Sequence, residues 1–178
     1  VVDAKVVDKD VKLPEERTTS VETLEADTLA VLSDLNHASQ KGLQTIFDCS
    51  VGRSTVNHPL GGRYQLTPTE ASVQKLPVQH GVTHTASVMA QGFNPYVAEW
   101  SPYHGAAYAV IEATARLVAT GANWSKARFS YQEYFERMDK QAERFGQPVA
   151  ALLGSIEAQI QLGLPSIGGK DSMSGTFE

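Results

Sequence analysis

The segment from Ser101 to Gly121 places the tightest limit on the fold, because it carries both a start and a stop signal for a helix. Ser101 is a preferred N-cap residue, and Pro102 fits the first helical position, where no backbone N–H is needed. Gly121 supplies the C-terminal stop. The residues expected to face inward recur at helical spacing: Ala106, Val110, Thr114, Leu117 and Val118. Since many neighbouring residues are small, we expect this helix to pack closely on a sheet.

The remaining elements are predicted from periodicity and from turn residues. Thr19 and Glu22 fit a capping box, and we expect residues 1–18 to form an extended arm or linker. The other expected helices cover residues 20–32, 131–145 and 148–163, and the expected extended segments cover 43–50, 63–67 and 82–89. Together these elements predict an α/β domain, layered as in α+β proteins, with a mixed sheet and helices on one face.

Composition excludes several classes of function. The 178 residues favour one domain, and the net charge of −5 is the wrong sign for a nucleic-acid partner. There is no apolar run of the roughly 20 residues needed to span a membrane and no signal-peptide pattern at the start, so we expect a cytoplasmic chain without a membrane partner. The single cysteine, Cys49, excludes an internal disulfide and is expected to be a small buried residue. Because the chain begins at Val1, we expect a piece of a longer polypeptide.

The segment "SIGGKDSMSG", residues 166–175, has a composition typical of phosphate-binding loops. It does not match the P-loop motif, because Asp171 follows Lys170 and Leu164 stands where the first glycine is required. Two interpretations stay open. The glycine amides beside Lys170 form an anion-binding concavity, or the segment is a glycine-rich turn with a solvated lysine.

Two further residues are weighed as chemical groups. Glu112 lies in the middle of the expected helix, where a carboxylate is a candidate magnesium ligand, but Arg116 lies four residues on and favours a helical ion pair. His58, in "VNHPLGG", is a candidate base, although a turn histidine is the favoured interpretation. The histidines show no metal-ligand spacing on one helix face, and no nucleophile elbow or Cys/His pairing is evident.

Three stretches carry a resemblance to a known family: "GGRYQLTPTEASVQKLP", "NPYVAEWSPYHGAAYAVIEA" and "LGLPSIGGKDSMSGTFE". They resemble the large single-chain type of phosphoribosylformylglycinamidine synthase, also called formylglycinamide ribonucleotide amidotransferase. The likeness runs from about Leu43 to the end of the chain, and "GGKDSMSG" is its most specific part. The resemblance implies a ligase of purine biosynthesis that uses ATP and takes ammonia from glutamine.

The resemblance also implies a domain organisation. Residues 43–178 resemble the N-terminal subdomain of the second of two synthetase copies, each similar to aminoimidazole ribonucleotide synthetase, and residues 1–42 are a linker with a leading helix. The implied partners are the remainder of the same polypeptide: the first synthetase copy, the C-terminal subdomain and the glutaminase. We therefore expect this fragment to be inactive alone and, when isolated, to associate with itself through sheet edges.

The implied site is an auxiliary one that holds ATP or ADP with magnesium. Its metal ligands match Glu70, in "TPTE", and Glu112, while Arg116 stands where a ligating amide is typical. The resemblance places a glycine-rich segment beside the pocket, so the expected nucleotide-binding residues are Gly168, Gly169, Lys170, Asp171 and Ser172. No catalytic residue is expected in this chain. Two alternatives stay open: a pairing module without a ligand, and a separate enzyme related to aminoimidazole ribonucleotide synthetase.

Overall fold

The central element is α4 (Pro102–Ala119), which begins and ends as the sequence predicts. In this computed structural model, which describes residues 20–47 and 49–175, Ser101 is the N-cap and its side chain accepts a hydrogen bond from the backbone N–H of His104. Ser101 is 0% exposed. Gly121 follows the C-cap with φ of 85°, a conformation that glycine adopts without steric cost. The predicted helix is therefore confirmed at both ends.

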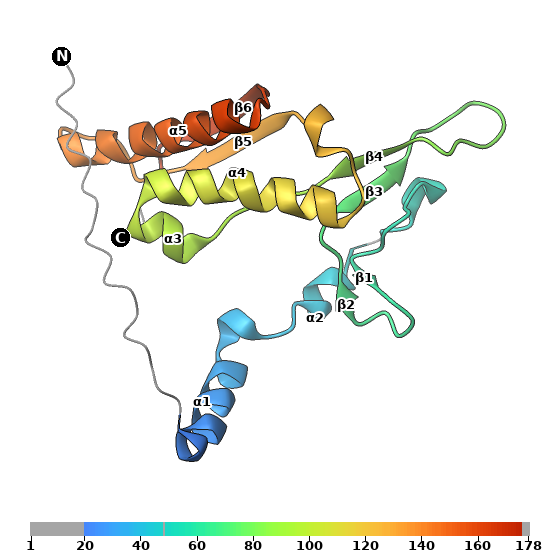
Figure 1. Ribbon diagram of the computed structural model, residues 1–178, viewed down its shortest axis with the longest axis horizontal. Helices are drawn as coiled ribbons and strands as arrows, with labels where there is room; N and C mark the ends of the chain where they lie inside the picture. Colours follow the sequence, from blue (N-terminus) through green and yellow to red (C-terminus); the bar gives the residue numbers. More distant parts are fainter. Residues whose placement is uncertain (1–19, 48, 176–178) are drawn as a thin grey trace.

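Along the described residues, helical elements come first, four short strands follow, and the longest helices and strands lie in the second half (Figure 1). Before α4 they are α1 (Val21–Ser33), η1 (Leu35–His37), α2 (Lys41–Gln44), η2 (Val51–Arg53), β1 (Leu60–Gly61), β2 (Thr67–Pro68), β3 (Ser72–Lys75), β4 (Ala86–Met89) and α3 (Pro95–Trp100). After α4 they are η3 (Trp124–Lys126), β5 (Phe129–Tyr134), α5 (Ala142–Leu162) and β6 (Ser166–Ser172).

The strands of the described residues pair in three two-stranded sheets of both kinds. β1 pairs with β2 and β3 with β4, both antiparallel, whereas β5 and β6 are parallel and joined through α5. A parallel pair needs a long crossover, and here a helix provides it. The α/β class predicted from the sequence is confirmed.

The core lies between α4, α5 and the β5–β6 sheet. Val110 of α4, only 1% exposed, packs with Phe129 of β5, Ala158 of α5 and Leu164, which precedes β6. Along β5 the buried and half-buried side chains alternate with exposed ones, as expected for a sheet covered on one face. α1 has no buried residue and lies apart from this layer (Figure 1).

Several sequence predictions are wrong in this half of the chain. Residues 131–145 were predicted as a helix, but β5 occupies the first part, because its alternate side chains pack under α4 and α5. The two helices predicted on either side of Gly146 are one helix, α5, which contains both Gly146 and Pro148. Its buried face of small residues packs along α4, and that packing outweighs poor local helix propensity. The predicted end at Gly163 is confirmed.

The N-terminal half also departs from prediction. Residues 43–50 were predicted as a strand, but the segment begins with α2, whose turn is closed by local hydrogen bonds such as that from Thr45 N to Lys41 O. The extended segment predicted at 63–67 is mostly wrong, because residues 63–65 form a turn and only Thr67 belongs to β2, whereas the segment predicted at 82–89 is confirmed in part as β4. The helix at 20–32 is confirmed as α1, with Ser20 as its N-cap. Thr19 and the arm of residues 1–18 lie outside the described residues.

The described helices include none that combines the length and the apolar character needed to cross a membrane.

Candidate functional site

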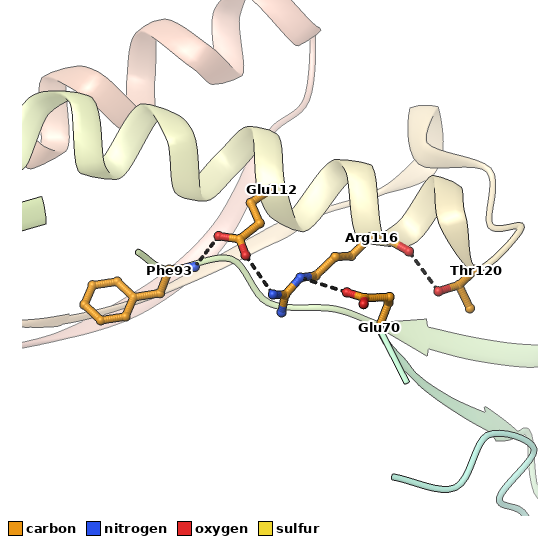
Figure 2. Close-up of polar contacts among 5 residues, drawn as sticks. All are labelled: Glu70, Phe93, Glu112, Arg116 and Thr120. Carbon is orange, nitrogen blue, oxygen red and sulfur yellow. Dashed lines mark hydrogen bonds and ion pairs between the residues drawn. The ribbon is translucent and has the colours of Figure 1, made fainter. Parts of the chain in front are cut away.

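The candidate site is built on α4 by two residues one turn apart. The Nη2 atom of Arg116 donates to Oε1 of Glu112 at 2.7 Å (Figure 2). Both side chains are one-third exposed. The spacing of four residues places both on one face of the helix, so the ion pair predicted from the sequence is confirmed.

The second carboxylate comes from a distant part of the chain. The Oε2 atom of Glu70 lies 3.2 Å from Nε of Arg116, so one guanidinium contacts two carboxylates through different nitrogen atoms (Figure 2). Glu70 is itself 56% exposed, but it directly precedes the buried Ala71 and the β3 strand. The structure therefore brings the two predicted metal ligands, Glu70 and Glu112, onto Arg116.

The loop before α3 completes the cluster. The backbone N–H of Phe93 donates to Oε2 of Glu112 at 2.9 Å. This contact depends on Gly92, because a Cβ atom at that position would lie 2.1 Å from the carbonyl oxygen of Ala109 in α4. Glu112 is thus held at both oxygens, one by a guanidinium and one by a backbone amide.

The resulting donor set does not fit a divalent cation between the two carboxylates. Arg116 occupies the space between them and is a permanent cation without an acceptor atom. Among the described residues, no three His, Cys, Asp or Glu side chains are grouped so that they could hold a metal ion. The role of Glu70 and Glu112 as magnesium ligands stays a prediction.

The predicted nucleotide-binding residues lie on a separate element. Gly168, Gly169, Lys170, Asp171 and Ser172 are all part of β6, so the alternative of a simple turn is wrong. Glycine-rich sequence is tolerated here because the strand approaches β5 closely: a Cβ atom at Gly169 would lie 2.6 Å from the Tyr131 carbonyl oxygen. All but Ser172 are exposed. Their binding of nucleotide stays a prediction.

Like charges face each other across this parallel pair. Glu133 of β5 is in register with Asp171 of β6. Burial, and secondly the charge of Asp171, raise the pKa of Glu133. Burial also raises the pKa of the neighbouring Tyr131 to about 12, with a smaller contribution from Glu133. Removing the Glu133 charge should therefore remove an unfavourable desolvation and a charge repulsion from the folded state.

The change Glu133→Gln is expected to raise the melting temperature at pH 7 by about 1–3 °C. When folding raises the pKa of a carboxyl group, its charged form destabilises the folded protein. This cost is absent below the unfolded pKa of about 4.3 and is complete once the pH has risen through the folded pKa. The gain should therefore disappear below about pH 4. Thermal unfolding followed by circular dichroism at both pH values measures it.

The exposed Glu25 of α1 provides the control for this prediction. Glu25→Gln should leave the melting temperature unchanged at both pH values. A lower melting temperature for Glu133→Gln at pH 7 would show that the charged form of Glu133 is stabilising.

One pair of chemically active side chains was not predicted. Sγ of Cys49 lies 3.2 Å from Nδ1 of His58, across an irregular loop of the chain. Cys49 is half-buried, so its prediction as a buried residue is wrong. The carbonyl of Cys49 accepts from the Thr55 hydroxyl, and that of His58 accepts from Thr69 at 3.0 Å. The signal, a cysteine and a histidine nine residues apart, fits no helix or strand period.

Comparison with known proteins links the fold to one solved structure. PurLQS from Thermotoga maritima matches with a TM-score of 0.62 and 18% sequence identity, over 79% of this chain and 21% of that chain. No family model and no curated protein matches the sequence. The chain therefore has an α/β fold that is also present within PurLQS, and it spans about a fifth of the length of that protein.

Proposed function

We propose that this chain is part of a phosphoribosylformylglycinamidine synthase, the ATP- and glutamine-dependent ligase that converts formylglycinamide ribonucleotide to its amidine in purine biosynthesis. The observation that carries the proposal is the fold likeness to PurLQS over 79% of the chain, which agrees with the family resemblance of three separate stretches of the sequence. Residues 43–178 are the N-terminal subdomain of a synthetase copy, and residues 1–42 are its linker and leading helix.

Within that ligase the domain acts as a scaffold with an auxiliary nucleotide site. The exposed β6 strand offers Lys170 and the nearby Ser172 as partners for the phosphates of ATP or ADP. Backbone amides can bind a phosphate only where side chains do not block it. Gly168 and Gly169 have no side chain and leave the backbone beside Lys170 open. The chain contributes no catalytic group of its own, so turnover requires the rest of the polypeptide. We expect the ligase to act in the cytoplasm.

A second candidate function is a pairing module without a ligand. Exposed apolar side chains on the parallel sheet support it, since Tyr134 of β5 is 68% exposed and Ile167 of β6 is 75% exposed. Large exposed apolar residues and open strand edges are typical of surfaces that contact another domain or a second copy. The partner is then the first synthetase copy, or another copy of this chain when the domain is isolated.

Growth without purines tests the ligase proposal. The complete polypeptide that contains this chain is expected to restore growth of a bacterial strain that lacks formylglycinamidine synthase. The purified polypeptide should release ADP or ATP on denaturation, and Lys170→Ala should lower that content about tenfold, because a charge-assisted contact to phosphate is lost. Lys140→Ala, which removes another lysine from a separate loop, should leave the nucleotide content unchanged.

The outcomes separate the two candidates. Failure of a soluble, complete polypeptide to restore growth contradicts the ligase proposal. Growth without any bound nucleotide, together with concentration-dependent dimerisation of the isolated domain in sedimentation, favours the pairing module.

A further inference from the structure

The arrangement around Arg116 differs from an ordinary surface ion pair, because it links two segments that are far apart in the sequence. Glu112 and Arg116 share one face of α4, whereas Glu70 comes from the loop before β3. Two carboxylates held this close repel each other unless a positive charge lies between them. The guanidinium supplies that charge.

We infer that Arg116 is a built-in replacement for a divalent cation, so that the cluster of Glu70, Arg116 and Glu112 is closed without metal. The guanidinium contacts the two carboxylates through Nε and Nη2, in the position where a bridging ion would have to contact both. A guanidinium is a permanent cation with donor atoms only. The link between the β3 segment and α4 is therefore independent of the magnesium concentration.

Occupation of the cluster by Arg116 and by a cation is mutually exclusive, because both would need the position between the two carboxylates. A cation that contacted both carboxylates would lie against the like charge of the guanidinium. The carboxylate of Glu112 is also oriented by the Phe93 N–H, which donates to its Oε2 atom. Removal of Arg116 would leave two unbalanced carboxylates side by side, and oxygen ligands of that kind attract Mg²⁺, Mn²⁺ or Ca²⁺.

A second arginine offers a matched control. Arg144 also contacts two carboxylates, Glu136 at 3.3 Å and Asp139 at 3.0 Å. Those residues lie on the same short loop before α5, outside any helix or strand, so without Arg144 their carboxylates can move apart into solvent. The loss of Arg144 therefore tests whether any arginine-to-neutral change increases cation binding.

Mn²⁺ binding, followed by electron paramagnetic resonance, tests the inference in the absence of nucleotide. The unmodified chain and Glu112→Gln should bind Mn²⁺ equally weakly. Arg116→Asn should bind it at least tenfold more tightly, and the double variant Arg116→Asn/Glu112→Gln should lose that gain. Arg144→Asn should behave like the unmodified chain, and Arg116→Lys, which keeps the charge, should show no gain.

Two results would overturn the inference. In the first, the unmodified chain binds Mn²⁺ and Glu112→Gln weakens that binding. This comparison needs no arginine variant, so it is valid even if Arg116→Asn does not fold. The other is an Arg116→Asn variant that is folded by circular dichroism but gains nothing, or gains no more than Arg144→Asn. The inference rests on the proposed function only in placing this cluster within the ligase. Because the Mn²⁺ assay contains no nucleotide, a failure of the inference is distinguishable from a failure of the proposed nucleotide site.

Discussion

Replacing Gly154 with valine is expected to unfold the α4–α5 layer. A Cβ atom at this position would lie 2.0 Å from the carbonyl oxygen of Tyr103, which belongs to the backbone of α4. No rotamer change relieves a contact between a Cβ atom and a main-chain oxygen, so the helices must separate. Overpacking of this kind costs about 1–3 kcal/mol when the core adapts, and more when the backbone must move.

The consequence extends beyond one contact, because the separated helices carry the core. Val110 of α4 and Ala158 of α5 both pack against Phe129 of β5, so a shift of either helix exposes that cluster. We expect Gly154→Val to lower the melting temperature by about 10 °C or more, or to leave no cooperative transition. Calorimetry or circular dichroism measures this directly.

Gly42 provides the matched control for this prediction. It also lies within a helix, α2, but a Cβ atom added there meets nothing within 4 Å. Gly42→Val is therefore expected to change the melting temperature by no more than about 1–2 °C. A Gly154→Val protein as stable as the unmodified chain would mean that α4 and α5 do not approach each other as described.

The change Gly92→Ala is expected to break the candidate site while leaving α4 in place. The new Cβ atom would lie 2.1 Å from the Ala109 carbonyl oxygen and 2.7 Å from the backbone nitrogen of Ala113, both in α4. A long helix is held by its own hydrogen bonds, whereas the loop is not, so the loop should move. Its movement withdraws the Phe93 N–H from Glu112.

The loss of that contact should change two measurable quantities, the exchange rate of one amide proton and the melting temperature. The amide proton of Phe93 should exchange with solvent at least tenfold faster than in the unmodified chain, and the melting temperature should fall by about 3–8 °C. Amide protons of α4 residues facing α5 should keep their protection, with Gly42→Ala as the control variant. Unchanged exchange at Phe93 would contradict the placement of this loop against Glu112.

The parts of the fold that follow from local chemistry could be predicted from the sequence. α4 is marked at both ends by residues whose effect is local, Ser101 with Pro102 at the start and Gly121 at the stop. The end of α5 at Gly163 is of the same kind, since this residue has φ of 67°. Such signals act within a few residues and need no knowledge of distant contacts.

The parts that depend on distant partners could not be predicted. β5 exists because Phe129 packs on α4 and because β6 pairs with it from the far side of a 21-residue helix. The glycines of β6 are typical of a turn, but within the strand Gly169 is explained by its close approach to Tyr131 and Gly168 by its φ of 152°. The continuity of α5 through Pro148 likewise comes from its packing on α4.

The same distinction applies to the candidate site. The pair of Glu112 and Arg116 follows from helical spacing, and it is present. The addition of Glu70 was implied by the family resemblance alone, because no spacing rule relates the β3 segment to α4. The Phe93 amide had no signal in the sequence, since a backbone donor can belong to any residue that a loop brings close.

The central claim is that Glu70 and Glu112 are joined by Arg116 and leave no place for a metal ion. The most direct measurement is a crystal structure of the chain grown with ADP and Mn²⁺, with anomalous scattering collected at the manganese edge. The guanidinium is expected between the two carboxylates, without an anomalous peak within 4 Å of both (about twice a metal–oxygen distance). A manganese peak bridging Glu70 and Glu112, with Arg116 turned away into solvent, would contradict the claim.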